Sequence, residues 1–385
     1  MVGGLAGLLA HRGITVFRAN AAFHADETAP ATSNHIVHLV PSPDQSDILT
    51  YHKADVPEPS GPTMDLTATN IVIATGAKPR PLPGNPFAGA LIDSTQALEV
   101  NEFPSSAVII GAGAIALEFA SMWNAAGSKV TLLIRKDRVL SAWDRRAGTT
   151  LTRELKRHGV NIITRASVTH VDTGANLGAT VHYTREGQDG EQSVWGEIAL
   201  VAIGRDPITD PAWGVTIDDH GHVATDAYGR TDKPGVWAVG DVTAGHALAH
   251  RAFEQGIVIA ETIAGLNPKP VDEATVPQIV FSFPEAASVG LTVEQAQARE
   301  DLIEIKETNY PMLANARMLM SGTAGSLTIV SGCDAANPDT PRVLGVHMVS
   351  QMASDIIAEA EQLVGNHVPL ADAARLVHPH PTFSE

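Results

Sequence analysis

The sequence is poor in cysteine and in basic residues, and each shortage excludes a class of function. Its 385 residues include one cysteine, Cys333, so neither a disulfide framework nor a cysteine-rich metal site can form within the chain. Lys and Arg number 26 against 43 Asp and Glu, which gives a formal net charge of -17. No compensating basic face is visible, so the charge argues against nucleic acid or an anionic membrane surface as a partner. Cys333 lies in a turn-like stretch, and we expect an inert structural thiol.

Long apolar runs are absent as well. No run approaches the roughly 20 residues that a membrane-spanning helix needs. The opening MVGGLAGLLAHRG has no basic start and no small-residue cleavage site, so we do not interpret it as a signal peptide. We expect the tail of a helix that leads into a strand over residues 14–18, in a cytoplasmic protein. The length is sufficient for two or three domains with real cores.

Residues 106–138 carry the clearest structural pattern. An apolar run over 107–110 meets a turn with Gly111 and Gly113, a helical pattern follows to 126, and a second apolar run covers 130–134. This order predicts the strand–turn–helix–strand unit that binds a dinucleotide. Glycine lets the backbone approach a pyrophosphate, whose charge is then stabilised by the amides that open the helix. A packing turn without a ligand is the alternative interpretation.

The rest of the chain predicts further α/β organisation. Residues 19–75 are β-rich, the run 69–76 reads as a buried strand that ends in a small-residue turn, and prolines at 79–86 mark a linker. A helix is expected over 145–158, then strands at 160–164, two hairpin strands near 181 and 194, and a buried strand over 198–203. An apolar strand then runs directly into Gly240 and Asp241, where an acid serves either a ligand or a helix cap. A helix over 248–264 precedes an α+β region, 270–385, with strands at 276–283, 302–310, 325–330 and 343–349.

Six motifs in a fixed order resemble a single family. They are ATG at 74–76, GAGAIALE at 111–118, IGR at 203–205, WAVGD at 237–241, VPQIVF at 276–281 and HPHPTFSE at 378–385. This series resembles the class I pyridine nucleotide-disulfide oxidoreductases, which are flavoproteins, and most closely their dihydrolipoamide dehydrogenase branch. The resemblance implies an α/β fold with two doubly wound Rossmann-like nucleotide-binding domains, the FAD one incomplete, and a C-terminal α+β dimerisation domain. The implied boundaries are 1–80 and 206–268 for the FAD-binding parts, 81–205 for the NAD(P)-binding domain and 269–385 for the dimerisation domain.

The same resemblance implies cofactor-binding residues. Those expected beside FAD are Thr75, Gly76, Ala77, Gly240, Asp241, Ala247, Leu248, Ala249 and His250. Those expected to hold the nicotinamide nucleotide are Gly111, Ala112, Gly113, Ala114, Ile115, Ala116, Glu118 and Gly204.

His380 and Glu385 match the catalytic acid/base dyad of the family. A thiol must lose its proton to attack a disulfide, an imidazole accepts that proton near neutral pH, and a carboxylate orients the ring. A solvated or capping histidine is the alternative. In the family this histidine acts on cysteines of the other subunit, which implies a homodimer. A lipoyl-bearing protein of a 2-oxo acid dehydrogenase complex is the further partner that the resemblance suggests.

Two departures from the family qualify these expectations. The family opens with its own GxGxxG turn for FAD and a cysteine pair, and neither is present, so the sequence is either a fragment of a longer chain or a shortened paralogue. In both cases it should hold FAD poorly or not at all and should not run disulfide chemistry alone. The function is then that of a flavin- and NAD(P)-dependent disulfide oxidoreductase in the parent protein. The alternatives are a non-catalytic nucleotide-binding or dimerising remnant, or another member such as a glutathione reductase-like enzyme, a transhydrogenase or a quinone reductase.

The second departure concerns NAD against NADP. An acidic residue about 20 positions after the glycine turn normally binds the ribose hydroxyl of NAD. Here Ile134 occupies that place, and Arg135 and Lys136 follow it. Two cations suit a 2′-phosphate and favour NADP slightly, whereas the lipoamide branch usually takes NAD. A solvated basic turn balanced by Asp137 is the alternative.

Overall fold

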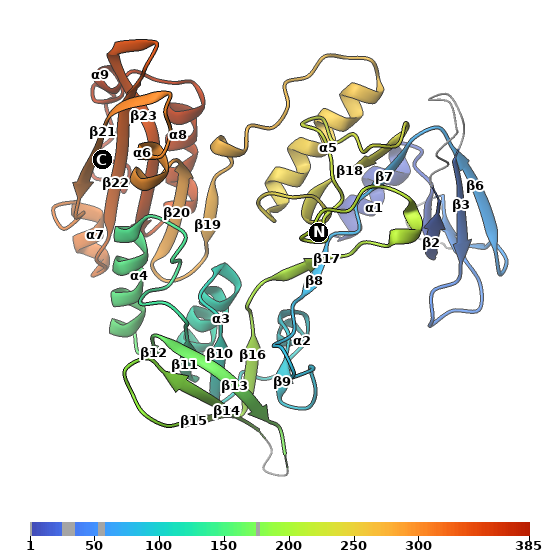
Figure 1. Cartoon of the computed structure of the whole chain (residues 1–385), viewed down its shortest axis with the longest axis horizontal. Coiled ribbons are helices and arrows are strands. Elements are labelled where there is room, and N and C mark those ends of the chain that lie inside the picture. The colour runs from blue at the N-terminus through green and yellow to red at the C-terminus, as the bar shows by residue number, and fades with distance from the viewer. Residues whose placement is uncertain (1, 25–34, 53–57, 175–177) are drawn as a thin grey trace. The chain divides into compact units, whose positions relative to one another are not determined.

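The computed structural model describes residues 2–24, 35–52, 58–174 and 178–385 (Figure 1). The chain forms two compact units, each assembled from two separate segments: Met1–Lys78 with Pro207–Val271, and Pro79–Asp206 with Asp272–Glu385. The short strands β8 (Ala77–Pro79) and β17 (Arg205–Pro207) contain two of the points where the chain passes between units. Within the described ranges, no helix has the length and apolar character to cross a membrane.

The first unit combines small antiparallel sheets with one parallel strand pair. After helix α1 (Val2–His11), strands β1 (Val16–Arg18), β4 (Leu49–Tyr51) and β5 (Glu58–Pro59) form one sheet. Strands β2 (Asn20–Phe23), β3 (His35–Val40) and β6 (Met64–Ala68) form another. The β-rich character expected for residues 19–75 is confirmed within the described part of that range.

The parallel pair of the first unit consists of β7 (Ile71–Ile73) and β18 (Val236–Ala238), and Val236 lies opposite Ile71. The single-turn helices η1 (Pro211–Trp213) and η2 (Gly240–Val242) and helix α5 (Ala249–Ile263) belong to the same unit. Strand β7 is less buried than expected, because Ile73 is buried but Val72 is 44% exposed.

The second unit contains a five-stranded parallel sheet in the order β12-β11-β10-β16-β9. Its strands are β9 (Leu91–Ile92), β10 (Ser106–Ile110), β11 (Lys129–Leu133), β12 (Asn161–Ile163) and β16 (Ile198–Val201). Helices α2 (Ser94–Leu98), α3 (Ala114–Ala125) and α4 (Arg145–Arg157) accompany the sheet. Helix α3 buries one apolar stripe, which is the period seen in the sequence: Ala116, Leu117, Phe119, Ala120 and Trp123. The predicted strand–turn–helix–strand unit is therefore confirmed.

An antiparallel sheet of three strands packs beside the parallel one. It consists of β13 (Ala166–Asp172), β14 (Ala179–Arg185) and β15 (Gln192–Gly196). The sequence predicted only the last two strands. Strand β13 was missed because its residues, ASVTHVD, are mostly polar and four of the seven are exposed. Its pairing with β14, not its composition, makes it a strand.

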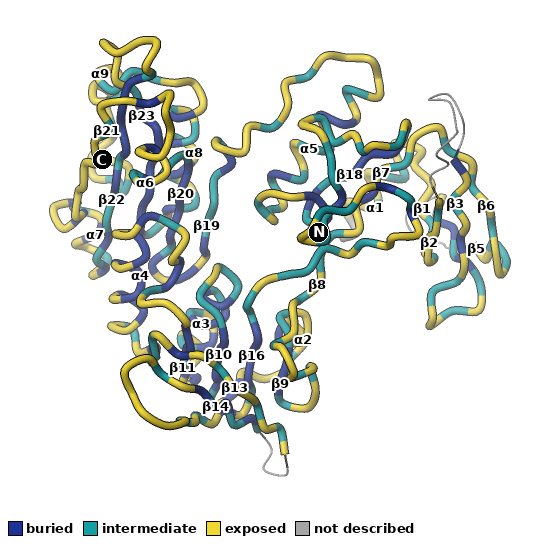
Figure 2. Tube along the Cα trace, viewed as in Figure 1, coloured by how far each residue is buried: buried dark blue, intermediate teal, exposed yellow. Residues whose placement is uncertain are grey.

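The C-terminal part of the second unit is an antiparallel sheet in the order β19-β20-β23-β22-β21. The strands are β19 (Gln278–Val280), β20 (Glu285–Gly290), β21 (Leu302–Tyr310), β22 (Ser326–Asp334) and β23 (Asn337–Ser350). Single-turn η3 (Glu273–Thr275) precedes them, and helices α6 (Val293–Gln297), α7 (Ala316–Ser321), α8 (Ala353–Gly365) and α9 (Leu370–Ala373) complete the region. The buried stretches of β20, β22 and β23 are visible in Figure 2.

The elements of this region differ from the sequence expectations in several places. Strand β19 is shorter than the predicted 276–283, and β20 and α7 were not predicted. Cys333 does not lie in a turn but inside strand β22, where it is 1% exposed. The buried position agrees with an inert thiol.

Candidate nucleotide pocket and acid/base pair

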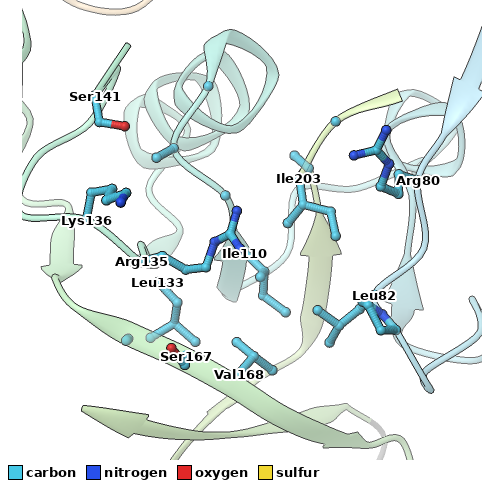
Figure 3. Close-up of a pocket in the computed structure, with 17 residues that line it drawn as sticks. Arg80, Leu82, Ile110, Leu133, Arg135, Lys136, Ser141, Ser167, Val168 and Ile203 are labelled. Carbon is cyan, nitrogen blue, oxygen red and sulfur yellow. The ribbon is translucent and has the colours of Figure 1, made fainter. Parts of the chain in front are cut away.

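A pocket of about 730 Å³ opens at the carboxyl ends of strands β10, β11 and β16 (Figure 3). The chain leaves β10 toward β11 and β12 on one side of the sheet and returns to β16 on the other. Ligands of open α/β sheets bind at such a reversal of strand order. The lining residues are Arg80, Leu82, Pro83, Ile110, Gly111, Ala112, Gly113, Leu133, Arg135, Lys136, Ser141, Ala166, Ser167, Val168, Ala202, Ile203 and Gly204.

The turn after β10 requires glycine at its first position. Gly111 has φ +142°, and a Cβ atom there would lie 2.2 Å from the carbonyl oxygen of Ala202. Gly113 begins helix α3 without a side-chain cap, so the amides of the first helical turn remain available to an anion. A Cβ atom on Gly113 would meet nothing within 4 Å. The turn therefore combines a close backbone approach with donors that suit a pyrophosphate.

Arg135 and Lys136 lie on the pocket wall where β11 ends, and both are exposed. Neither cation has a carboxylate partner within salt-bridge distance in the described part of the chain. Asp137 was the expected counter-charge, but its Oδ1 lies 3.2 Å from Nη1 of Arg138. Two cations that pair with no carboxylate in the described ranges therefore border the pocket, and in Figure 3 Lys136 lies toward Ser141.

Several pocket residues were not predicted from the sequence. Arg80, Leu82 and Pro83 come from the proline-rich stretch that was interpreted only as a linker. Nε of Arg80 lies 2.7 Å from Oδ1 of Asp206, which fixes its direction. Ser167 and Val168 lie on β13, the strand that was missed. No local pattern marks these residues, because only the pairing of β13 brings them to the pocket.

Other predicted nucleotide residues lie on helix α3 and do not line the pocket. They are Ala114, Ile115, Ala116 and Glu118. Oε1 of Glu118 accepts a hydrogen bond of 3.0 Å from the backbone amide of Phe281. This contact ties α3 to the segment after β19, and the predicted contact of Glu118 with a ribose stays a prediction.

Five of the residues expected beside FAD lie in the first unit just after the carboxyl ends of β7 and β18. Thr75, Gly76 and Ala77 follow β7, and Gly240 and Asp241 follow its parallel neighbour β18. Parallel strands end at one edge of a sheet, so these two groups share that edge. Oγ1 of Thr75 donates to the carbonyl oxygen of Ile208 at 2.6 Å.

The start of helix α5 carries the other residues expected beside FAD. Leu248 is the cap of α5, without a side-chain cap bond, and Ala249 and His250 open the helix, with Ala247 just before it. Asp241 lies in the first turn of η2, and both interpretations of this carboxylate, as a ligand contact or as a helix cap, stay predictions.

These residues fit only part of an FAD molecule. The sequence contains one GxG, at Gly111, and it belongs to the second unit. The described first unit therefore offers strand ends and a helix start to a flavin, but no glycine turn of this kind to its pyrophosphate.

His380 and Glu385 lie within hydrogen-bond distance, with 2.6 Å between Nδ1 and Oε2. The His380 side chain is 73% exposed. Asn315, which is 2% exposed, fixes this segment, because its amide donates to the carbonyl oxygens of Thr382 at 2.9 Å and Glu385 at 3.2 Å. His378 pairs instead with Glu359 at 2.7 Å. A proton on Nδ1 of His380 leaves Nε2 with an accessible lone pair, as a base requires.

Comparisons of the sequence with known proteins identify the family to which the chain belongs. Residues 6–256 match the pyridine nucleotide-disulphide oxidoreductases, and residues 276–385 match the dimerisation domain of the same proteins. The chain is 37% identical over 326 residues to dihydrolipoyl dehydrogenase of Cupriavidus necator, which covers 83% of this chain and 67% of that protein. It is 32% identical over 391 residues to a dihydrolipoyl dehydrogenase of Bacillus subtilis, with coverage of 100% and 75%.

A solved structure gives the same result for the fold. The crystal structure of LpdA from Mycobacterium tuberculosis superposes with a TM-score of 0.78 at 25% identity, over 94% of this chain and 74% of that one. The chain therefore belongs to the pyridine nucleotide-disulphide oxidoreductases, a family of enzymes that use FAD and NAD(H).

Proposed function

We propose that this chain acts in a flavin- and NAD(P)-dependent disulfide oxidoreductase of the dihydrolipoyl dehydrogenase type. The proposal rests chiefly on the pocket at the ends of β10, β11 and β16. There the Gly111 turn and two cations, neither of which pairs with a carboxylate of the described residues, face one cavity. Segment 81–205 is then the NAD(P)-binding domain, and segments 1–80 and 206–268 are the flavin-binding parts. Segment 269–385 is the dimerisation domain.

A nicotinamide nucleotide fits the residues that line this pocket. Its pyrophosphate would lie against the amides after Gly111, and Arg135 and Lys136 would bind the adenosine ribose with its 2′ substituent. Gly204, with φ +133°, lets the chain pass close to the ligand on the opposite wall. When bound, the nicotinamide ring supplies hydride transfer.

The pair of His380 and Glu385 would hold and move the proton of a substrate thiol. Glu385 fixes the Nδ1–H tautomer, so that Nε2 of His380 accepts the proton. The match to the dimerisation domain supports a homodimer. In that assembly the exposed ring of His380 would serve the flavin side of the partner subunit, and the lipoyl group of a 2-oxo acid dehydrogenase complex would reach it. We place this activity in the cytoplasm.

The single cysteine favours a second candidate function. Cys333 is buried in β22, so disulfide exchange needs a dithiol from outside these 385 residues. Without one, the chain would bind nucleotide and form dimers without turnover.

Oxidation of dihydrolipoamide by NAD⁺ or NADP⁺, followed on the purified parent protein that contains this chain and is saturated with FAD, tests the proposal. Removal of a general base costs about 10²–10⁴-fold in rate, so we expect that loss in His380→Gln. The matched control is His378→Gln, which should stay within about twofold of the wild type because His378 pairs with Glu359 outside the dyad. Nucleotide binding without turnover would favour the second candidate, and equal turnover of His380→Gln and wild type would refute the assigned dyad.

A further inference from the structure

The solvent face of the β13–β14 hairpin carries a cluster of histidines and carboxylates that the nucleotide pocket does not use. His170 on β13 lies directly opposite His182 on β14. Val181 and Tyr183, the neighbours of His182, are buried in the core. Because side chains alternate along a strand, His182 points to the other face, where it meets His170 and Asp172.

Both imidazole rings have a carboxylate at each nitrogen. The rings stack with 4.0 Å between centroids and 9° between planes. Their Nε2 atoms face the same oxygen, Oδ2 of Asp172, at 3.8 Å for His170 and 3.1 Å for His182. Their Nδ1 atoms face the carboxylate of Glu191 at 3.8 Å and 3.5 Å.

Neutral imidazole rings cannot donate a hydrogen bond from both nitrogens to the carboxylates around them. A neutral imidazole carries one N–H, so one nitrogen of each ring must present a lone pair to a carboxylate oxygen. A second proton on both rings would place two like charges face to face at 4.0 Å. A cation between Asp172 and the two Nε2 atoms removes both difficulties, because each Nε2 becomes a ligand. Each Nδ1–H then faces an acceptor, which is Oγ1 of Thr169 at 3.3 Å for His170 and the carboxylate of Glu191 at 3.5 Å for His182.

We propose that His170, Asp172 and His182 form a binding site for a divalent cation of the zinc class. With metal–ligand bonds of about 2.0–2.1 Å, tetrahedral geometry separates neighbouring ligand atoms by about 3.3 Å. The Nε2–Oδ2 distances of 3.1 Å and 3.8 Å bracket this value, and all three ligand atoms lie within 4.8 Å of one another. The rings must rotate out of their parallel stack for both lone pairs to converge. The His170 side chain, 47% exposed, has room to do so.

Glu191 supplies the outer support that metal-binding histidines usually have. Carboxylates that accept the second ring N–H fix the tautomer and raise ligand basicity. Oγ1 of Thr169 donates to Oε1 of Glu191 at 2.6 Å. This hydrogen bond orients the Glu191 carboxylate toward the Nδ1 atoms of the two rings.

The donor set and its place indicate which cation binds and with what effect. Two imidazoles and one carboxylate suit Zn²⁺ and its neighbours, whereas Mg²⁺ and Ca²⁺ prefer oxygen ligands alone. The ion would join β13 to β14. Ser167 and Val168, earlier on β13, line the nucleotide pocket, so the site lies beside the pocket wall but outside it.

Calorimetric titration of untagged protein with Zn²⁺, in a buffer that does not chelate metals, tests the site. We expect one equivalent to bind, and His170→Gln and His182→Gln each to weaken that binding at least tenfold. Glu191→Gln should weaken it about tenfold, as loss of outer-shell partners does. The matched control is His38→Gln, which removes a histidine paired with a single carboxylate, Asp65, at 2.6 Å and should leave the affinity unchanged.

A second measurement needs no variant. In protein with ¹⁵N-labelled histidine, Zn²⁺ should shift the Nε2 resonances of His170 and His182 and leave that of His38 in place, and excess Mg²⁺ should not reverse the shift. Equal affinity of wild type and His182→Gln would overturn the proposal. So would Zn²⁺ shifts confined to other histidines, or no binding at 100-fold molar excess.

Discussion

Reversing the charge at position 135 should change which nicotinamide nucleotide this chain prefers. Arg135 lies on the pocket wall, is exposed and has no carboxylate partner among the described residues. Its charge is therefore available to a ligand. In Arg135→Glu the same position would repel a 2′-phosphate and accept hydrogen bonds from a 2′-hydroxyl, as the acidic residue of NAD-binding turns does.

The magnitude follows from the charges and the exposure of the site. One pair of unit charges at about 4 Å contributes about 1 kcal/mol in water and more where water is partly excluded. A 2′-phosphate carries about -1.5 to -2, and the substitution changes the protein charge by two units. After screening by physiological salt, we expect a loss of about 1–3 kcal/mol for NADPH relative to NADH, or about 5–150-fold in the ratio of dissociation constants.

Fluorescence titrations with NADPH and NADH at 0.15 M salt measure that ratio of dissociation constants. Comparing the affinities of adenosine 2′,5′-bisphosphate and 5′-AMP isolates the contribution of the 2′-phosphate. The matched control is Lys129→Glu, the same charge reversal at the exposed first residue of β11. The two positions are six residue steps apart, which in extended backbone is about 20 Å or more than two Debye lengths, so the control should change the ratio less than twofold. An unchanged ratio in Arg135→Glu, or an equal change in Lys129→Glu, would show that position 135 does not distinguish the nucleotides.

Three further changes probe other parts of the structure. Gly111→Ala should lower the free energy of unfolding, measured in urea titrations, by a few kcal/mol, because its Cβ would lie 2.2 Å from a backbone oxygen. The control Gly113→Ala should stay within about 1 kcal/mol of the wild type. Equal losses of stability in the two variants would contradict the close contact at Gly111. Burial lowers the pKa of His347, so the folded state favours the neutral ring. The free energy of unfolding of the wild type should therefore fall as the pH drops below about 6.5, by at most about 1.4 kcal/mol per pH unit from this group. The variant His347→Gln should lack this contribution to the pH dependence. Asn315→Ala should lower the free energy of unfolding by about 2–3 kcal/mol and speed the exchange of backbone amide hydrogens in residues 378–385. Unchanged exchange would show that Asn315 does not hold the terminal segment in place.

The sign of the His347 effect follows from its contacts. The ring is 1% exposed, its Nε2 donates to the carbonyl oxygen of Leu291 at 3.0 Å, and its Nδ1 accepts from Ser288 at 2.7 Å. A second proton would have to displace the Ser288 hydroxyl hydrogen inside the core. The unfolded chain therefore binds the proton more readily at acidic pH, and unfolding is favoured there.

The sequence alone determined the parts of this protein in which a local pattern fixes a local structure. The turn at Gly111 was predictable because only glycine tolerates its backbone angle and close contact, and helix α3 because its apolar residues repeat with the helical period. The position of Asp241 after a parallel strand followed from an apolar run that ends at Gly240. In each case the residues that cause the structure are neighbours in the chain.

Only the tertiary structure decided which distant residues meet. Strand β13 has too few apolar residues to be recognised and exists because β14 pairs with it, which brings Ser167 to the pocket and His170 against His182. Asp137 was an obvious partner for the cations beside it, yet its oxygen pairs with Arg138 and leaves Arg135 to the pocket. Pairing across strands and the direction of a side chain depend on atoms supplied from elsewhere in the fold, and no local pattern of residues contains that information.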